Sequence, residues 1–228
     1  MSSAISIRNL NLAYYKSESD NYSFKKFLMT GNLLPEKKRV FKNFSLDVHN
    51  STILGIEGSN GVGKTSLLAA IAGLLPVESG EIKTKGKVLP LLGLGHVFHP
   101  DLDIQRNIEL WNLSFSTNFK INESFVFKIL ENAGLNVSPS TVLRSLSSGM
   151  KSRLAFELAM HGNEDILLLD EVFAVGDQRF REQSARKMKQ KLKSLQCAII
   201  VSHDLNVLKD NCDRVIRILS PSDFEEVN

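Results

Sequence analysis

The residues with the clearest capacity for chemistry form a glycine-rich run that fits the pattern G-x-x-x-x-G-K-[ST] at every position, Gly58-Ser59-Asn60-Gly61-Val62-Gly63-Lys64-Thr65. Glycines allow backbone N–H groups to turn inward around phosphate oxygens, and the N-terminus of a following helix adds a favourable dipole. Lys64 would supply a cation for the β- and γ-phosphates of a nucleotide, and the Thr65 hydroxyl would be a ligand for Mg²⁺. This run, called the P-loop below, predicts a nucleoside triphosphate site.

A second segment would complete such a site with carboxylates. Four apolar residues at 166–169 stand directly before Asp170 and Glu171, as in a strand buried on both faces of a parallel sheet. Open α/β sheets bind ligands at the carboxyl ends of their strands. Asp170 would hold Mg²⁺, directly or through water, and Glu171 would act as the general base that polarises the attacking water. Apolar runs that end in acids are common, so this assignment depends on the P-loop.

A histidine follows another buried strand. His203 comes just after the apolar run at 198–201, which we expect to end at the same edge of the sheet. A lone histidine at a strand end is more often structural than catalytic, but this placement favours a role in the site. Its imidazole would hydrogen-bond the γ-phosphate or position the water. The expected catalytic residues are therefore Lys64, Glu171 and His203.

The composition is typical of a globular protein with a real core. The chain has 228 residues, of which 43% are hydrophobic and 23% charged, and this excludes a disordered chain, a collagen-like repeat and a disulfide-dense mini-protein. A formal net charge of only +3 gives no case for a general nucleic-acid binder. The two cysteines, Cys197 and Cys212, are too few for a disulfide framework and favour a reducing compartment.

The sequence carries no sign of a membrane segment. The amino terminus lacks the pattern of a signal peptide, and Ser2 in place of glycine excludes myristoylation. The longest mainly apolar uncharged runs, at 67–77 and 88–98, hold 11 residues each, whereas a membrane span needs roughly 20. We expect nothing here to cross a bilayer by itself.

The remaining pattern predicts one α/β domain with a helical insertion. We expect strands at 5–7, 45–48, 52–56 and 214–219 in addition to 166–169 and 198–201. We also expect a helix at 65–72 capped by Gly73, and mainly helix over 101–160, where Gly134 ends one helix. Between the last two buried strands, an apolar stripe lies opposite a basic face at 179–193 that we interpret as solvated surface. The domain spans 1–228, with a core at about 1–100 and 162–228 and a helical subdomain at about 101–161.

A basic stretch at 21–42 lies between the first two strands. It holds only one acid, Glu36, and interleaves aromatic residues with six basic ones, Lys25, Lys26, Lys37, Lys38, Arg39 and Lys42. It is either a solvated loop or short surface helix, or a contact surface for a membrane face or a partner.

One further motif distinguishes among P-loop families. Leu146-Ser147-Ser148-Gly149-Met150 precedes a helical run, and Ser147 stands 23 residues before Asp170. By itself the tetrad at 146–149 is a helix-capping sequence in most proteins. In the order P-loop, tetrad, Asp-Glu and His, the chain resembles the ABC-type ATPases.

The resemblance implies a P-loop NTPase fold of the ABC type, with a mixed or parallel sheet core, an N-terminal antiparallel β region and an inserted helical subdomain. It also implies a homodimer that sandwiches two ATP molecules, each bound to the P-loop of one copy and to Ser147, Ser148 and Gly149 of the other. Asp177, in the segment 174–177, would contact the second copy. Tyr14, with Tyr15 as the fallback, would stack on adenine, although either could be a packed surface tyrosine. The residues implied to bind ATP are Tyr14, Gly58, Ser59, Asn60, Gly61, Val62, Gly63, Lys64, Thr65 and Ser66, and those for Mg²⁺ are Thr65 and Asp170.

Within these ATPases, three segments (95–102, 146–156 and 170–177) resemble subunits that export bacterial surface polysaccharides, including O-antigen, capsule and teichoic acid, and the likeness runs from Ile5 to Leu219. It implies that ATP hydrolysis drives export of a glycan through a separate integral membrane subunit, with this chain peripheral on the cytoplasmic face of the bacterial inner membrane. The alternatives are an exporter of a drug or lipid, or a soluble ATPase acting on DNA or ribosomes. Only 83 residues separate Lys64 from Ser147, and they contain no heptad repeat, which disfavours the ATPase heads of DNA-repair proteins. We therefore expect no nucleic-acid partner.

Two departures and one boundary qualify the resemblance. His99 stands where the family usually has glutamine, and we assign no metal-binding role to it because imidazole is a poor ligand for Mg²⁺. It would sense or contact the transporter, or be an ordinary loop histidine. Only the ends of 102–107 match the usual family segment. The sequence stops soon after the strand at 214–219, so we expect no carbohydrate-binding tail, which favours a capsule-type or tail-less glycan exporter over one that recognises a chain-terminating sugar.

Overall fold

The structure, a computed structural model, describes residues 2–15, 37–93, 98–115, 119–171 and 178–227. The strands are β1 (Ser3–Tyr15), β2 (Lys37–His49), β3 (Thr52–Glu57), β4 (Ser79–Thr84), β5 (Val88–Leu92), β6 (Ile166–Asp170), β7 (Cys197–Val201), β8 (Arg214–Ser220) and β9 (Asp223–Glu226). The helices are α2 (Lys64–Ile71), α3 (Ile104–Phe115), α4 (Glu123–Asn132), α5 (Ser148–His161), α6 (Gln178–Leu192) and α7 (Leu205–Asn211), with a 3₁₀ turn, η1, at Leu143–Ser145. The α/β class that the sequence predicted is confirmed.

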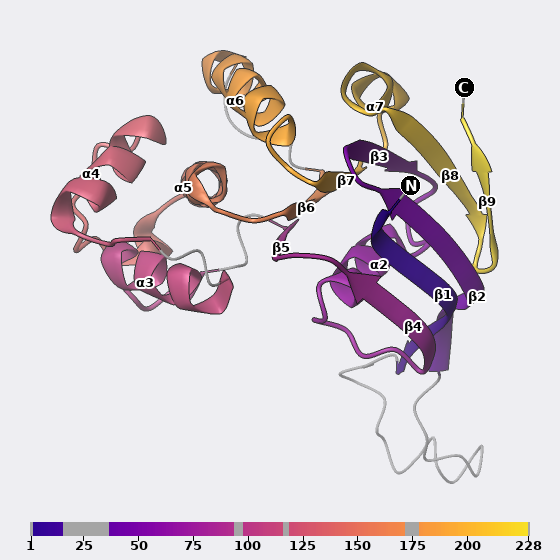
Figure 1. The fold of residues 1–228 in the computed structure, drawn as a ribbon. Helices are drawn as coiled ribbons and strands as arrows, with labels where there is room; N and C mark the ends of the chain where they lie inside the picture. Colours follow the sequence, from indigo (N-terminus) through magenta and orange to yellow (C-terminus); the bar gives the residue numbers. More distant parts are fainter. Residues whose placement is uncertain (1, 16–36, 94–97, 116–118, 172–177, 228) are drawn as a thin grey trace, which may run out of the picture.

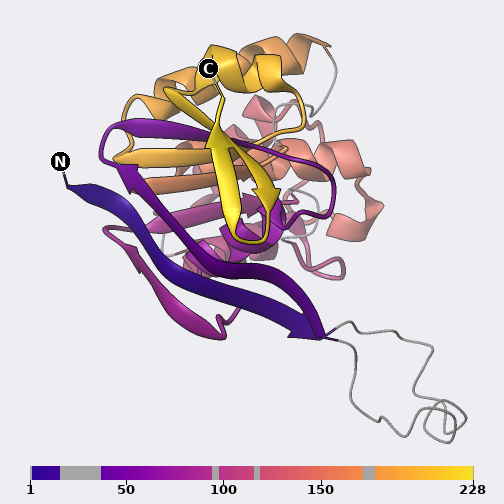
Figure 2. The ribbon, with the colours of Figure 1, turned by 90° about the vertical axis from the view of Figure 1, so that its right-hand side faces the viewer.

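Two sheets organise the molecule. The large sheet has the order β5-β6-β7-β3-β8-β9, and all its pairings are parallel except that of β8 with β9. The small sheet has the order β2-β1-β4 and is antiparallel throughout. In Figure 1, the helices α3, α4 and α5 lie beyond β5 and β6, on the side away from β1, β2 and β4. In Figure 2, which looks at the molecule from the side of the N-terminal strands, these strands lie nearest the viewer and the fainter pink helices lie behind them.

The central strands are apolar because both faces of the large sheet are covered. In β6, Leu167 and Leu169 face a core made with α3 to α7, whereas Ile166 and Leu168 face a core made with α2 and the small sheet. All four side chains are fully buried. Each such burial contributes about 1.5–3 kcal/mol. The continuous apolar runs of β6 and β7 are thus the expected signature of parallel strands between two layers.

Local signals set the helix ends as the sequence predicted. Gly73 and Gly134 follow α2 and α4 with φ of 72° and 66°, the left-handed conformation that glycine favours after a helix. The strands β1 and β2, at 13 residues each, extend well beyond the short predicted segments. They do so because each pairs with the other along its length across several register shifts, which no local pattern reveals.

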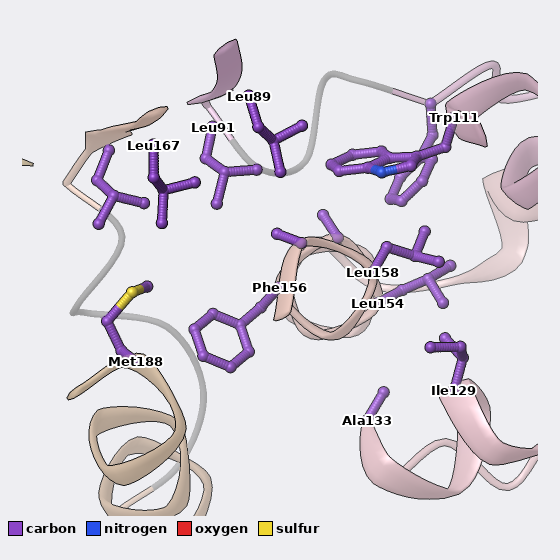
Figure 3. Close-up of a cluster of buried hydrophobic side chains, with 14 of the residues drawn as sticks. Leu89, Leu91, Trp111, Ile129, Ala133, Leu154, Phe156, Leu158, Leu167 and Met188 are labelled. Carbon is purple, nitrogen blue, oxygen red and sulfur yellow. The ribbon is translucent and has the colours of Figure 1, made fainter. Parts of the chain in front are cut away.

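The helical side of the core is continuous from α4 to α6. In Figure 3, Leu154 and Leu158 of α5 face Ile129 and Ala133 of α4. Phe156 points from α5 to the opposite side, where Met188 of α6 lies. None of the described helices is both long and apolar enough to span a membrane.

The basic face of α6 is only partly solvated, which corrects our interpretation. Lys187 donates to Oε1 of Glu157 on α5 at 2.6 Å, and Lys191 lies 3.0 Å from Glu164. The Glu157 side chain is 1% exposed. Ionised carboxylates are costly to bury without a partner, so these two lysines point towards the buried acids rather than into solvent.

We expect Lys187→Ala to lower the free energy of unfolding by about 2 kcal/mol, because it leaves the buried Glu157 carboxylate without its cation. Lys189→Ala, at an exposed position of the same helix, should change it by less than about 0.5 kcal/mol. Urea unfolding of both variants makes the comparison, and equal effects would contradict a structural role for the ion pair.

Candidate functional site

The P-loop joins β3 to α2 and is pressed against β2. Gly63, the N-cap of α2, has φ of 111°, and a Cβ built on it would lie 2.2 Å from Cγ1 of Val40. Only a residue without a side chain tolerates both that backbone and that contact. Gly61 also has positive φ, 79°, but a Cβ there would meet nothing within 4 Å. The glycine at 63 is therefore required by close packing as well as by conformation.

Lys64 is held at the centre of the loop. Its residue is 7% exposed, and its Nζ donates to the carbonyl oxygens of Gly58 at 2.6 Å and Ser59 at 3.1 Å. An ammonium has three donors, so one hydrogen remains beyond these two bonds. The loop thus holds a nearly buried cation with donor capacity left.

Glu57, the last residue before the loop, is fixed by the C-terminal strands. Its carboxylate accepts from Arg217 of β8, which also donates to Glu225 of β9 at 3.0 Å. The hydrogen bond to Glu57, and then its charge, raise the pKa of the Arg217 guanidinium above its ordinary value. The start of the P-loop is therefore anchored to the edge of the large sheet.

A hydrogen bond links the P-loop to the end of β6. Oγ1 of Thr65 lies 2.6 Å from Oδ2 of Asp170, to which it donates. A hydroxyl and a carboxylate oxygen side by side are the kinds of ligand that a hard divalent cation prefers. The described residues contain no group of three or more His, Cys, Asp or Glu that could hold a metal by itself. The two oxygens are thus a partial ligand set for such a cation.

Glu171 and His203 meet at the same edge of the sheet. Oε1 of Glu171 lies 3.1 Å from Nδ1 of His203, and their side chains are 50% and 71% exposed. Glu171 has φ of 53°, a left-handed conformation that is uncommon for a non-glycine residue, and its N–H donates to the Val201 carbonyl at 3.1 Å. The turn after β6 thus directs this carboxylate towards the end of β7.

A pocket of about 440 Å³ collects most of these groups. It brings together predicted residues from the P-loop, β1 and the end of β6, namely Tyr14, Asn60, Gly61, Gly63, Lys64, Thr65, Ser66, Asp170 and Glu171. Gly58, Ser59, Val62 and His203 are not among its lining residues.

Three lining residues were missed from the sequence: Lys38 of β2, Gly93 after β5 and Ser152 of α5. Gly93 follows a parallel strand at the ligand-binding edge, which was a usable signal. Lys38 and Ser152 depend on tertiary placement.

The tetrad residues lie outside this pocket. Ser147 caps α5, its Oγ accepting from the Met150 N–H at 3.2 Å, and Ser148 and Gly149 form the first turn. All three are exposed, and none of them lines the pocket. A Cβ built on Gly149 would meet nothing within 4 Å. The N-terminus of α5 is therefore exposed, with free space beside Gly149.

Some predicted residues take other positions. His99 lies in a turn held by Asn107, whose buried amide accepts from the His99 N–H at 2.8 Å and donates to the His99 carbonyl at 3.0 Å. His99 does not line the pocket. Asp177, the segment 174–176, residues 95–97 and the side chain of Tyr15 lie outside the described residues. Burial raises the pKa of the Cys197 and Cys212 thiols to about 12, so neither supplies a thiolate near neutral pH.

Comparison with known proteins relates the sequence to a family described as ABC transporter, which matches residues 41–174. The chain is 34% identical over 174 residues to the teichoic acids export ATP-binding protein TagH of Enterococcus faecalis, and this match covers 76% of the chain and 39% of that protein. It is 32% identical over 184 residues to the O-antigen export system ATP-binding protein RfbE of Yersinia enterocolitica, covering 81% of the chain and 77% of the relative. The chain thus spans well under half of the Enterococcus protein.

Among solved structures, the fold is similar to that of the ATP-binding cassette MJ0796, solved as a dimer in a post-hydrolysis state bound to ADP and Pi. The TM-score is 0.74 at 20% identity, and the match covers 98% of this chain and 99% of the other. At that identity the likeness concerns the fold alone.

We expect Gly63→Ala to lower the free energy of unfolding by about 3 kcal/mol, because the new methyl group must displace Val40 in a strained backbone. Gly61→Ala, at a positive φ without a nearby atom, should cost about 1–2 kcal/mol. Urea unfolding of the two alanine variants separates steric contact from conformation, and equal losses would show that the contact with β2 is unimportant.

Proposed function

The chain belongs to the ABC transporter family of ATP-binding proteins, and we propose that it is the ATP-hydrolysing subunit of an exporter of cell-surface polysaccharide or lipid-linked glycan. The observation that carries this proposal is the convergence of Lys64, Thr65, Asp170 and Glu171 on one pocket at the carboxyl edge of the large sheet. The printed names of the relatives, which concern export of teichoic acids and O-antigen, support the cargo class.

Binding of ATP would use the cation and the N–H groups of the P-loop. Lys64 already points its ammonium to the loop carbonyls and retains one donor for the β- and γ-phosphates. The start of α2 adds its N–H groups and dipole, which favour an anion. Tyr14, at the small-sheet end of the pocket, would stack on adenine.

Thr65 and Asp170 would hold Mg²⁺ together with phosphate oxygens. The 2.6 Å approach of their oxygens fits a hard cation. Bound there, the ion would neutralise charge on the phosphates.

Hydrolysis would depend on Glu171 and His203. The Glu171 carboxylate would accept a proton from the attacking water as general base. In the neutral ring that donates Nδ1–H to Glu171, the Nε2 atom of His203 is an acceptor, whereas the protonated ring would also donate to the γ-phosphate. His203 would thus hold the Glu171 carboxylate in place and could also donate a hydrogen bond to the γ-phosphate.

A second copy of the chain would complete the site. Ser147, Ser148 and Gly149 are exposed at the N-terminus of α5 and do not line the pocket of their own chain, which supports their binding to the ATP of a partner copy. Asp177 would contact that copy. The dimeric state of the similar cassette protein agrees with this arrangement.

The remaining partners follow from the relatives. A separate integral membrane subunit would form the path for the glycan, and this chain would be peripheral on the cytoplasmic face of the bacterial inner membrane. The chain would divide into a core at about 1–100 and 162–228 and a helical subdomain at about 101–161. The core would bind the nucleotide, and the helical subdomain would contact the membrane partner.

Glu171→Gln should reduce ATP turnover at least a hundredfold, since an amide cannot accept the water proton. ATP binding should persist and a stable dimer should accumulate, as measured by phosphate release and size-exclusion chromatography with ATP. Glu131→Gln, at an exposed position of α4, is the control and should behave as wild type. Full hydrolysis by the Glu171 variant would refute the assignment of the base.

The same variant tests export. In the bacterium, replacing the wild-type chain by Glu171→Gln should deplete surface polysaccharide while its lipid-linked form accumulates inside. Unchanged surface glycan in cells whose ATP turnover is lost would exclude this cargo and favour a drug or lipid.

Ser147→Arg should abolish ATP-dependent dimerisation, because a bulky cation would occupy the helix N-terminus that faces the partner's ATP. The monomer should lose only about 1 kcal/mol of folding stability, for the missing cap. Ser222→Arg, at the exposed turn between β8 and β9, is the control. Sedimentation with ATP distinguishes the two, and a normal dimer of the Ser147 variant would contradict the shared site.

A further inference from the structure

Lys38 is a cation of the pocket that the proposed function leaves without a role. It lies on β2 directly opposite Tyr14 of β1 in the antiparallel pair, and both residues line the pocket. Directly opposed residues of such a pair have Cβ atoms about 5 Å apart on the same face. Lys38 is therefore the immediate neighbour of the aromatic ring proposed to stack on adenine.

An irregularity in the strand pairing turns Lys38 towards the pocket. Leu12 pairs with Phe41 and Ala13 pairs with Arg39, so Val40 is an extra residue of β2. Such a bulge places two successive side chains on one face, and Val40 and Phe41 are indeed both buried, both next to Gly63. Lys38, two residues before Val40, shares that face.

The two cations of the pocket are in different states. The Lys64 ammonium is nearly buried and bonded to two carbonyls. Lys38 is exposed, and within the described ranges its ammonium makes neither a hydrogen bond nor an ion pair. Both carboxylates that line the pocket lie at the end of β6 rather than on the small sheet, since Asp170 is the last residue of β6 and Glu171 is the next. Lys38 is thus a cation available to an anion that enters beside Tyr14.

We propose that Lys38 is a nucleotide-binding residue whose ammonium contacts the α-phosphate of the bound nucleotide. With adenine on Tyr14 and the β- and γ-phosphates on the P-loop, the ribose and α-phosphate must lie between them, beside Lys38. A charge-assisted contact there is roughly twice as strong as a neutral hydrogen bond. This inference rests on the proposed function, since it takes ATP as the ligand of the pocket.

The inference separates Lys38 from the rest of the basic stretch at 21–42. The sequence groups it with five other basic residues as solvated surface or as a contact for a partner. Lys42, on the same strand, is exposed and does not line the pocket. It is therefore a matched control for the charge of this stretch.

The test compares Lys38→Met with Lys42→Met in the full chain, because methionine keeps much of the apolar stem and removes the charge. Binding of ADP and of the non-hydrolysable analogue AMP-PNP is measured by titration calorimetry at about 0.1 M salt, where exposed charges still interact over about 10 Å. Lys38→Met should weaken both nucleotides equally, by about five- to tenfold. Lys42→Met should leave both affinities unchanged, and Lys38→Arg should restore them.

Each other outcome overturns the inference. Unchanged affinities for Lys38→Met would exclude the contact, and a loss confined to AMP-PNP would place the ammonium at the γ-phosphate. A similar loss for Lys42→Met would mean that only the net charge of the stretch matters. If wild-type protein bound neither nucleotide, the proposed function itself would fail. Substitution at exposed Lys38 should leave unfolding within about 0.5 kcal/mol of wild type, and turnover at saturating ATP should stay constant while KM rises.

Discussion

The hydrogen bond from Thr65 to Asp170 holds the two halves of the nucleotide pocket together. Thr65 belongs to the helix that follows β3, whereas Asp170 ends β6, and β7 lies between these strands in the sheet. The bond therefore passes over the end of the middle strand, beyond which His203 lies. Because the phosphate loop and the carboxylates come from segments 105 residues apart, the site exists only while the sheet keeps those strands in parallel register.

Much of this site and of the fold around it can be predicted from short stretches of sequence. The P-loop, the buried strands that end at Asp170 and Val201, and the helix-ending glycines at 73 and 134 each depend on a few neighbouring residues, and the structure has them where they were predicted. The full length of β1 and β2 and the inward position of Lys38 could not be found in this way. They follow from strand pairing and from one bulge, which are tertiary properties.

The charge pattern of α6 gives the clearest example of a local interpretation that failed. A basic helical face looks solvated when it is considered alone. Lys187 nevertheless forms an ion pair with Glu157 on α5, and Lys191 forms one with Glu164 just after α5. Arg153 of α5 also lies 4.9 Å from the ring centre of Phe180 on α6. The two helices are joined by charge as well as by apolar packing. The exposed N-terminus at Ser147 thus belongs to a helix that is joined to α6 by the Lys187–Glu157 ion pair as well as by apolar packing.

The extra residue at Val40 also determines where the N-terminal region can gain or lose residues without moving Lys38. If the ladder were regular, with Phe41 still opposite Leu12, Val40 would lie opposite Ala13, and Arg39 rather than Lys38 would lie opposite Tyr14. A change in the number of residues between Tyr15 and Lys37 leaves this pairing untouched. The length of the connection between β1 and β2 can therefore vary among homologues, whereas the one extra residue between Arg39 and Phe41 must be kept for Lys38 to lie opposite Tyr14.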